Sequence, residues 1–274
     1  MKTLDDIKGW LIDLEGTLYV GDTLFQGAKE LVGKLRGNGK SFRFISNSTV
    51  LSRKQISRKL QNLGIPTEEK EIFTASSAAA HILKSFDGIK CFFAVADSLM
   101  DDFKGIEISE KNPDYVVIGD VGTAVNYDLI NKIFKFVMAG SELIALQKNK
   151  FSRGIDGLQI DAGAFVTAIE YAADKEAKII GKPSRQFFNL AVHDIRVETG
   201  QRWLSAEFAM VGDDIESDIK GAMDAGLAGI LVKTGKSNDS YSAHFGIVPD
   251  MTFDSVEDLN NSLRFGASGL IVNR

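Results

Sequence analysis

Short apolar segments of this chain end in polar residues and alternate with segments that have helical spacing. The segment "GWLIDL" at 9–14 runs into Asp13, and "SFRFISN" at 41–47 follows after an amphipathic stretch at 27–39. The same order returns at 207–235, where "EFAMVGDD" and "AGILVKTG" flank another amphipathic stretch. Alternation of buried strands with helices is typical of a parallel sheet covered by helices. The sequence therefore predicts an α/β fold.

The helix predictions rest on apolar spacing and on residues that begin or end helices. In "LSRKQISRKLQNLGI" at 51–65, Ser52 is a helix-capping residue and Gly64 is a stop signal. In the segment 27–39, Gly37 or Gly39 ends the helix. The segment 215–227 follows the acids of 213–214 and predicts a third helix.

The middle of the chain, from about Ser76 to about Lys178, contains strand and helix signals of its own. We predict strands in "CFFAVAD", "YVVIGD" and "ELIALQ", and helices in "YDLINKIFKFVMAG" and "AFVTAIEYAA", the last with Phe165, Ile169 and Ala172 on one face. Such a segment can bury its own core. The predicted domains are a core at 1–77 and 179–274 and an inserted second domain at 78–178.

Composition limits the classes of function. The chain has 274 residues, 44% of them hydrophobic and 25% charged, which is ordinary for a globular protein. Its net charge of −5 argues against nucleic acid or an anionic membrane as a partner. The chain has one cysteine, Cys91, so the sequence favours a location in a reducing cytoplasm. Cys91 is expected to be a small core residue. The sequence shows no signal pattern and no apolar run of membrane-spanning length.

Chemically active side chains follow the candidate core strands. The first strand ends in Asp13 and Glu15, the second in Ser46 and Asn47, "AKIIGKP" in Lys182, and "AMVGDD" in Asp213 and Asp214. Ligands of open parallel sheets bind at the carboxyl ends of the strands. Acids that meet there would repel one another, and a hard divalent cation such as Mg²⁺ would relieve the repulsion.

Each of these residues also has a structural interpretation. Asp13 alone can be a solvated turn acid, and Ser46 and Asn47 alone are better explained as turn caps. Lys182 alone is typical of a surface lysine, and Asp213 and Asp214 alone can cap the following helix. The order and spacing of the four groups favour function.

The four groups together resemble the motifs of the haloacid dehalogenase-like superfamily of phosphohydrolases. Here "DLEGT", Ser46 of "FISN", Lys182 of "GKP" and the acids of "GDDIESD" stand in the family order. Lys182 follows Ser46 by 136 positions. A large insert at this point resembles the NagD and p-nitrophenyl phosphatase subfamily. The resemblance implies a Rossmann-like parallel-sheet core with an inserted α/β cap of the C2 type.

The resemblance also implies a mechanism and a set of roles. Asp13 would be the nucleophile and form an aspartyl-phosphate. Mg²⁺ would be held by Asp13, Asp213 and the backbone carbonyl of Glu15, while Thr17, Asp214 and Asp218 would orient the loop, the ligand waters or the lysine. The catalytic residues would be Asp13, Glu15 and Lys182, and the phosphate-binding residues Asp13, Leu14, Glu15, Ser46, Asn47 and Lys182. The substrate would be a small phosphorylated molecule, and the protein would form a homodimer, since relatives of this kind often pair.

Glu15 departs from the family pattern. Most family phosphatases have Asp there, which protonates the leaving group and then activates water. Glu15 is one methylene longer, so its carboxyl can act as the acid only if the loop or cap accommodates the extra length. Its backbone carbonyl can bind metal regardless of side chain.

Other features of the sequence give weaker signals. His81, His193 and His244 are the only histidines, none lies at a core strand end, and each is expected at the surface or in packing. "GNGK" at 37–40 lacks P-loop spacing. The basic segment 147–154 can contact substrate or be a solvated loop. The tail 265–274 has no predicted role.

Three functions share these sequence features. The first is a Mg²⁺-dependent phosphatase of small phosphomonoesters, whose cap selects the substrate. The second is a catalytically weak protein that binds a phosphorylated metabolite or a partner, suggested by the altered acid. A phosphate-accepting receiver domain would share the strand-end acids, but it needs no inserted cap and is about half as long.

Overall fold

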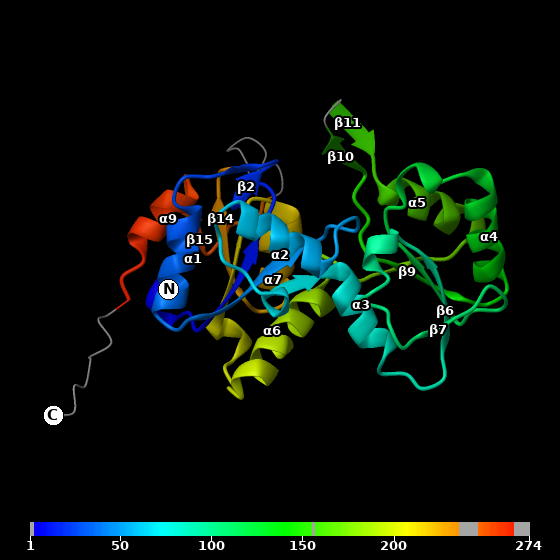
Figure 1. The fold of residues 1–274 in the computed structure, drawn as a ribbon, viewed down its shortest axis with the longest axis horizontal. Coiled ribbons are helices and arrows are strands. Elements are labelled where there is room, and N and C mark those ends of the chain that lie inside the picture. The colour runs from blue at the N-terminus through cyan, green and yellow to red at the C-terminus, as the bar shows by residue number, and fades with distance from the viewer. Residues whose placement is uncertain (1–2, 155–156, 236–245, 266–274) are drawn as a thin grey trace. The chain divides into compact units, whose positions relative to one another are not determined.

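The computed structural model describes residues 3–154, 157–235 and 246–265 and divides into two compact units (Figure 1). Unit 1 comprises the described residues of 1–45, 57–72 and 188–274, and unit 2 comprises 46–56 and 73–187. Each unit is built around its own parallel sheet. The structure thus confirms the α/β class, while the domain limits 1–77, 78–178 and 179–274 stay a prediction.

A six-stranded sheet has the order β15-β14-β13-β1-β4-β5. Every residue of the central strands β1 and β13 is buried, because their apolar runs lie between neighbours on both sides and helices on the faces. The strands are β1 (Gly9–Asp13), β4 (Ser41–Ser46), β5 (Ile72–Thr74), β13 (Phe208–Gly212), β14 (Ala228–Val232) and β15 (Met251–Phe253).

The chain changes direction across this sheet at β1. From β1 it proceeds to β4 and β5 on one side, and later returns to β13, β14 and β15 on the other side. Strand β1 pairs in parallel with both β4 and β13. A crevice at such a switch point, outside the carboxyl ends of the strands, is where open α/β sheets bind ligands.

The helices named by spacing form close to their predicted limits. The residues Ala28, Leu31, Val32 and Leu35 of α1 are buried, and α1 packs against α9 (Figure 1). The Ser52 hydroxyl accepts the N–H of Gln55 at 3.3 Å, which confirms Ser52 as the cap of α2. The helices that lie wholly or mostly in unit 1 are α1 (Ala28–Gly37), α2 (Arg53–Asn62), α6 (Arg185–Thr199), a π-helical segment Ile215–Lys220 that runs into α7 (Gly221–Asp224), and α9 (Val256–Ser262). Of these, α6 and α9 were not predicted.

Unit 2 contains a five-stranded sheet of order β12-β9-β8-β6-β7, and all its described pairs are parallel. Its strands are β6 (Lys90–Ala94), β7 (Glu107–Ile108), β8 (Tyr115–Ile118), β9 (Glu142–Ala145) and β12 (Lys178–Ile179). Its helices are α3 (Ala75–Leu83), α4 (Tyr127–Met138) and α5 (Ala162–Ala173). The three strands and two helices predicted in this part of the chain are all present.

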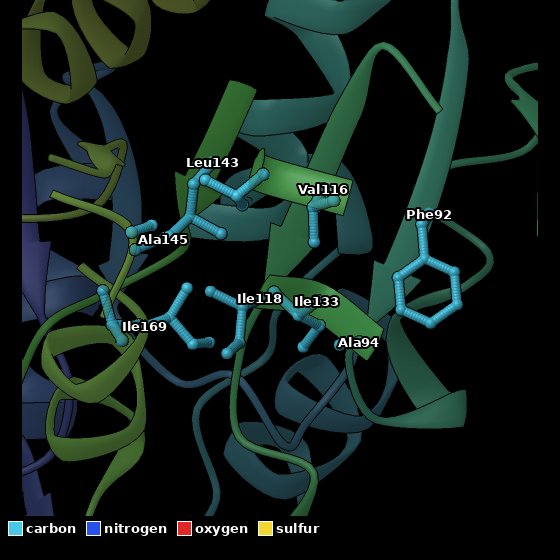
Figure 2. Packing of buried hydrophobic residues seen from close by; sticks show 11 residues of the cluster. Phe92, Ala94, Val116, Ile118, Ile133, Leu143, Ala145 and Ile169 are labelled. Carbon is cyan, nitrogen blue, oxygen red and sulfur yellow. The ribbon is translucent and has the colours of Figure 1, made fainter. Parts of the chain in front are cut away.

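The core of unit 2 lies between this sheet and the helices α4 and α5. Figure 2 shows Phe92, Val116 and Leu143 from three strands near Ile133 of α4 and Ile169 of α5. All five are at most 6% exposed. Unit 2 therefore buries a core of its own, as predicted for the inserted segment.

Of the three residues noted on one face of α5, only Ile169 is buried. Ile169 is buried, but its buried neighbours are Val166 and Ala173, whereas Ala172 is exposed and Phe165 is only half-buried. The segment is apolar at almost every position, so its spacing is compatible with more than one buried face. Contact with the sheet selects between them.

The strand before Lys182 was also assigned to the wrong sheet. Lys178 and Ile179 pair with Ile144 and Ala145 of β9, at the edge of the five-stranded sheet. A pairing of two residues has too little apolar pattern to indicate which sheet it joins.

Two hairpins were not predicted. One joins β2 (Tyr19–Val20) to β3 (Thr23–Leu24), and the other joins β10 (Phe151–Gly154) to β11 (Gly157–Ile160). The second contains half of the basic segment 147–154, so the interpretation of that segment as a loop is wrong for its last four residues.

The remaining sequence predictions concern single side chains. Cys91 is fully buried in β6, as predicted. His81 and His193 lie at exposed helix positions, which confirms the surface interpretation. His244 and the tail residues 266–274 lie outside the described residues.

Candidate active site

Asp13 is the last residue of β1 and is only 7% exposed. Its strand is in register with β4 and β13, so Asp13 is paired with Ile45 while the preceding Ile12 is paired with Val211. A carboxylate is thereby positioned at the carboxyl end of the central strand, beside the switch point. The apolar run before it determines this position.

The loop after β1 closes on its own backbone. The carbonyl of Leu14 accepts the N–H groups of Thr17 and Leu18, and the Gly16 N–H donates to the carbonyl of Tyr19 at 2.8 Å. Gly16 has a φ of +90°, and a Cβ added there would lie 2.4 Å from Oδ2 of Asp213. Glycine is therefore required both for the turn and for the close approach of the loop to Asp213.

Asp213 and Asp218 reach the same place from β13 and the following helical segment. Asp213 follows β13 directly and is 2% exposed, and Asp218 is 1% exposed. The absence of a side chain at Gly212 admits Asp218, since a Cβ there would lie 2.3 Å from its Oδ2. Asp214 is the cap of the helical segment, because its Oδ1 accepts the N–H groups of Glu216 and Ser217.

Asp13, Asp213 and Asp218 form a compact group of buried carboxylates. One oxygen of each lies within 4.8 Å of the others. The Thr17 hydroxyl lies 3.2 Å from Oδ2 of Asp13 and 3.2 Å from Oδ1 of Asp213, so it links two of them. Three negative charges at this spacing repel one another. A group of carboxylate oxygens fits a hard cation such as Mg²⁺, which would offset the repulsion.

The loop after β14 closes this group from a third side, and this contact was not predicted. The Thr234 hydroxyl donates to the Gly16 carbonyl at 2.7 Å. A Cβ on Gly235 would lie 2.0 Å from Oδ2 of Asp213 and 2.8 Å from Cα of Gly16. The only available signal was the position of "KTG" directly after a predicted core strand.

Glu15 points to the β2–β3 hairpin. Its side chain is 61% exposed, and Oε1 accepts the Gly21 N–H at 3.0 Å while Lys59 Nζ lies 3.9 Å from Oε2. Glu15 is thus not a member of the carboxylate group.

The Tyr19 ring lies under the ammonium group of Lys59. Burial, followed by the charges of Glu15 and Asp13, raises the pKa of the Tyr19 hydroxyl far above the ordinary range.

The predicted phosphate-binding residues Asn47 and Lys182 contact each other in unit 2. The Lys182 N–H donates to Oδ1 of Asn47, and Nδ2 of Asn47 donates to the Lys182 carbonyl, both at 2.8 Å. Lys182 is 5% exposed. Ser46 ends β4, and its hydroxyl accepts the Ser48 N–H at 3.0 Å. The site residues thus form two groups, one in each unit.

Comparison with known proteins identifies the family. The model described as haloacid dehalogenase-like hydrolase matches residues 10–109, and a second model, described as HAD-hydrolase-like, matches 179–259. Haloacid dehalogenase-like hydrolase domain-containing protein 2 of Bos taurus is 36% identical over 255 residues, which cover 93% of this chain and 95% of that protein. The chain belongs to the haloacid dehalogenase-like hydrolase family.

Two further members of this hydrolase family are similar over nearly their whole length. Human phospholysine phosphohistidine inorganic pyrophosphate phosphatase is 33% identical over 263 residues, which cover 94% of this chain and 94% of that protein. The crystal structure of 4-nitrophenylphosphatase from Thermotoga maritima superimposes with a TM-score of 0.87 at 29% identity, covering 95% of this chain and 99% of that one. The predicted resemblance to the NagD and p-nitrophenyl phosphatase subfamily is confirmed, as is the prediction of an enzyme of the phosphatase type.

Within the described ranges, the helices are too short or too polar to span a membrane.

Proposed function

We propose that the protein is a Mg²⁺-dependent phosphatase of small phosphomonoesters that acts through an aspartyl-phosphate on Asp13. The observation that supports this most is the group of three buried carboxylates at the switch point of a parallel sheet. Asp13, Asp213 and Asp218 would hold the ion, together with the Glu15 carbonyl. Bound Mg²⁺ would neutralise charge on the phosphoryl oxygens and so permit attack by an anion.

The reaction would proceed in two displacements. An oxygen of Asp13 attacks phosphorus, the bond from phosphorus to the ester oxygen breaks, and the alcohol leaves with a proton. Water then attacks the phosphorus of the acyl phosphate, which restores the carboxylate and releases inorganic phosphate. Ser46, Asn47 and Lys182 would bind the transferring oxygens, with Leu14 and Glu15 contributing backbone N–H groups.

Glu15 would donate the proton and later receive one from water. In the structure the Glu15 carboxylate accepts a hydrogen bond from the Gly21 N–H and lies 3.9 Å from Lys59 Nζ. The side chain is exposed, and such interactions at an exposed surface contribute little to the free energy of folding. The Glu15 side chain can therefore rotate away from the hairpin at a small cost in free energy.

We further propose that the protein is located in the cytoplasm and forms a homodimer.

The decisive experiment is hydrolysis of p-nitrophenyl phosphate by wild type and Asp13→Asn with and without Mg²⁺. We expect turnover that requires Mg²⁺ and that is lost in the variant. Wild-type turnover that survives in Asp13→Asn would overturn the covalent mechanism.

The second candidate is a catalytically weak protein that binds a phosphorylated ligand. The exposed position of the Glu15 carboxylate favours it, because a phosphatase needs a proton donor near the leaving group. Folded wild type that binds phosphate esters with Mg²⁺ but hydrolyses none of them would support this function.

A further inference from the structure

The carboxyl edge of the five-stranded sheet in unit 2 brings together residues that no motif indicated. The strand pairing continues past the strand ends, since Gly181 N–H donates to the Leu146 carbonyl and Leu146 N–H donates to the Ile118 carbonyl, both at 2.9 Å. The next residues along these strands are Lys182, Gln147 and, after Gly119, Asp120. This edge therefore has a lysine at one strand and an aspartate two strands away.

The segment 47–49 runs along the same edge. A Cβ on Gly181 would lie 2.5 Å from Oδ1 of Asn47, and a Cβ on Gly119 would lie 3.3 Å from the Thr49 Cβ. The Thr49 hydroxyl accepts the Asp120 N–H at 3.1 Å. Asn47 and Lys182 thus lie on the edge that also contains Asp120, all within unit 2.

Asp120 has an oxygen available for a ligand, whereas Gln147 does not. Both polar atoms of the buried Gln147 are used, Nε2 on Asp161 and Oε1 on the Asn149 N–H. Asp120 is half-buried, and its Oδ1 accepts the Gly122 N–H at 2.7 Å. Within residues 3–154, 157–235 and 246–265, the structure shows no donor to its Oδ2.

We infer that Asp120 selects substrates with a cationic amine on the alcohol part of the phosphate ester. This inference rests on the proposed function, in which Lys182 and Asn47 bind the phosphoryl group. Neighbouring strands lie about 4.8 Å apart, so Asp120 is about 10 Å from Lys182 along the edge. A small phosphorylated amine has its two charges within that span, with opposite signs to those of Lys182 and Asp120.

The test compares pairs of esters of matched size. The substrates are 2-aminoethyl, 4-aminobutyl and 6-aminohexyl phosphate, each against the n-alkyl phosphate in which a methyl group replaces the ammonium. We expect the amine ester to have the higher kcat/KM in at least one pair. The ratio of kcat/KM for the amine ester to kcat/KM for its alkyl partner should fall about tenfold in Asp120→Asn, as for loss of a hydrogen bond to a charged group. Asparagine retains the acceptor for the Gly122 N–H, so the turn is preserved.

Asp114→Asn is the matched control. Asp114 precedes β8 at its opposite end, is exposed, and accepts the Lys90 N–H, a bond that asparagine also can accept. In Asp114→Asn, the ratio of kcat/KM for the amine ester to kcat/KM for the alkyl ester should equal that of wild type. An unchanged ratio in Asp120→Asn, or an equal loss for both esters of a pair, would overturn the inference.

Failure of the proposed function gives a different result. In that case wild type hydrolyses no ester, including p-nitrophenyl phosphate. Calorimetric titration of the same esters into Asp13→Asn and Asp13→Asn/Asp120→Asn with Mg²⁺ then decides, because it needs no turnover. Tighter binding of the amine that depends on Asp120 supports the inference, and equal binding of amine and alkyl ester contradicts it.

Discussion

Glu15 differs from the usual family residue by one methylene, and the proposed acid role makes a specific prediction for its variants. Glu15→Gln keeps an acceptor for the Gly21 N–H but cannot donate a proton from a carboxyl group. We expect hydrolysis of an alkyl phosphate to fall about a hundredfold or more, the range of general acid catalysis. Hydrolysis of p-nitrophenyl phosphate should change little, because its phenolate leaves without a proton.

The comparison of the two esters is measured as kcat for each variant. Lys59→Met serves as the control, since it removes the charge near Glu15 and leaves the carboxyl group. Equal losses on both esters in Glu15→Gln would mean that Glu15 acts by another route, such as through the shape of the hairpin.

Cys91 predicts a dependence of stability on pH. Burial, and next the charge of Asp114, raises the pKa of the thiol from 9.0 to about 12. The folded state then keeps a proton that the unfolded state loses above pH 9, so wild type loses stability as the pH rises from 9 to 12. The free energy of unfolding should fall by up to about 1.4 kcal/mol per pH unit from this group.

Urea unfolding of wild type and Cys91→Ala at pH 8 and pH 10 tests this. Other groups that titrate in this range are present in both proteins and cancel in the difference. The stability advantage of wild type over Cys91→Ala should narrow at pH 10. An advantage that stays constant would contradict the prediction.

At the scale of elements, the sequence predicted the strands and helices that have strong apolar patterns. Strands β1, β4 and β13 were predictable because each is a continuous apolar run that ends in polar residues. The two hairpins were not, since pairings of two to four residues have little pattern and depend on tertiary contacts. Strand β12 was predicted as a strand, but it was expected in the other sheet. For the same reason the sheet to which β12 belongs could not be predicted.

The site shows a similar division. Asp13 and Asp213 were predictable from the strand ends, but the entry of Asp218 into the carboxylate group depends on the bare backbone of Gly212. Gly235 lies against Asp213, and Thr234 donates to the Gly16 carbonyl, only because β14 lies next to β13. Such contacts join residues distant in sequence, and no local pattern encodes them.

The loop after β14 therefore gives a prediction at this scale. In Gly235→Ala the new Cβ would lie 2.0 Å from Oδ2 of Asp213, so either the loop or the carboxylate must move. We expect kcat/KM to fall at least tenfold, and the Mg²⁺ concentration for half-maximal rate to rise. Gly33→Ala on α1 is the control, because a Cβ there meets no atom within 4 Å and the rate should be unchanged. Similar kinetics for both variants would mean that the loop has no part in the site.

At the scale of the whole molecule, the carboxylate group predicts that metal stabilises the fold. An ion bound only by the folded state raises the melting temperature, and removal of Mg²⁺ by a chelator should lower it by several degrees. Asp13→Asn removes one of three mutually repelling charges. Without metal this variant should melt above wild type, and its response to Mg²⁺ should be smaller. Scanning calorimetry with and without Mg²⁺ measures both effects, and identical curves would contradict them.

The central position of β1 also has a consequence for synthesis of the protein. Gly9 of β1 pairs with Phe208 of β13, about 200 positions later. At about 5 to 20 residues per second, a ribosome needs roughly 10 to 40 s to make the intervening chain. During that interval β1 can pair on one edge with β4, while its other edge stays open to wrong partners. A nascent chain halted before residue 208 should therefore need a chaperone to remain unaggregated, even if β1 and β4 have already paired.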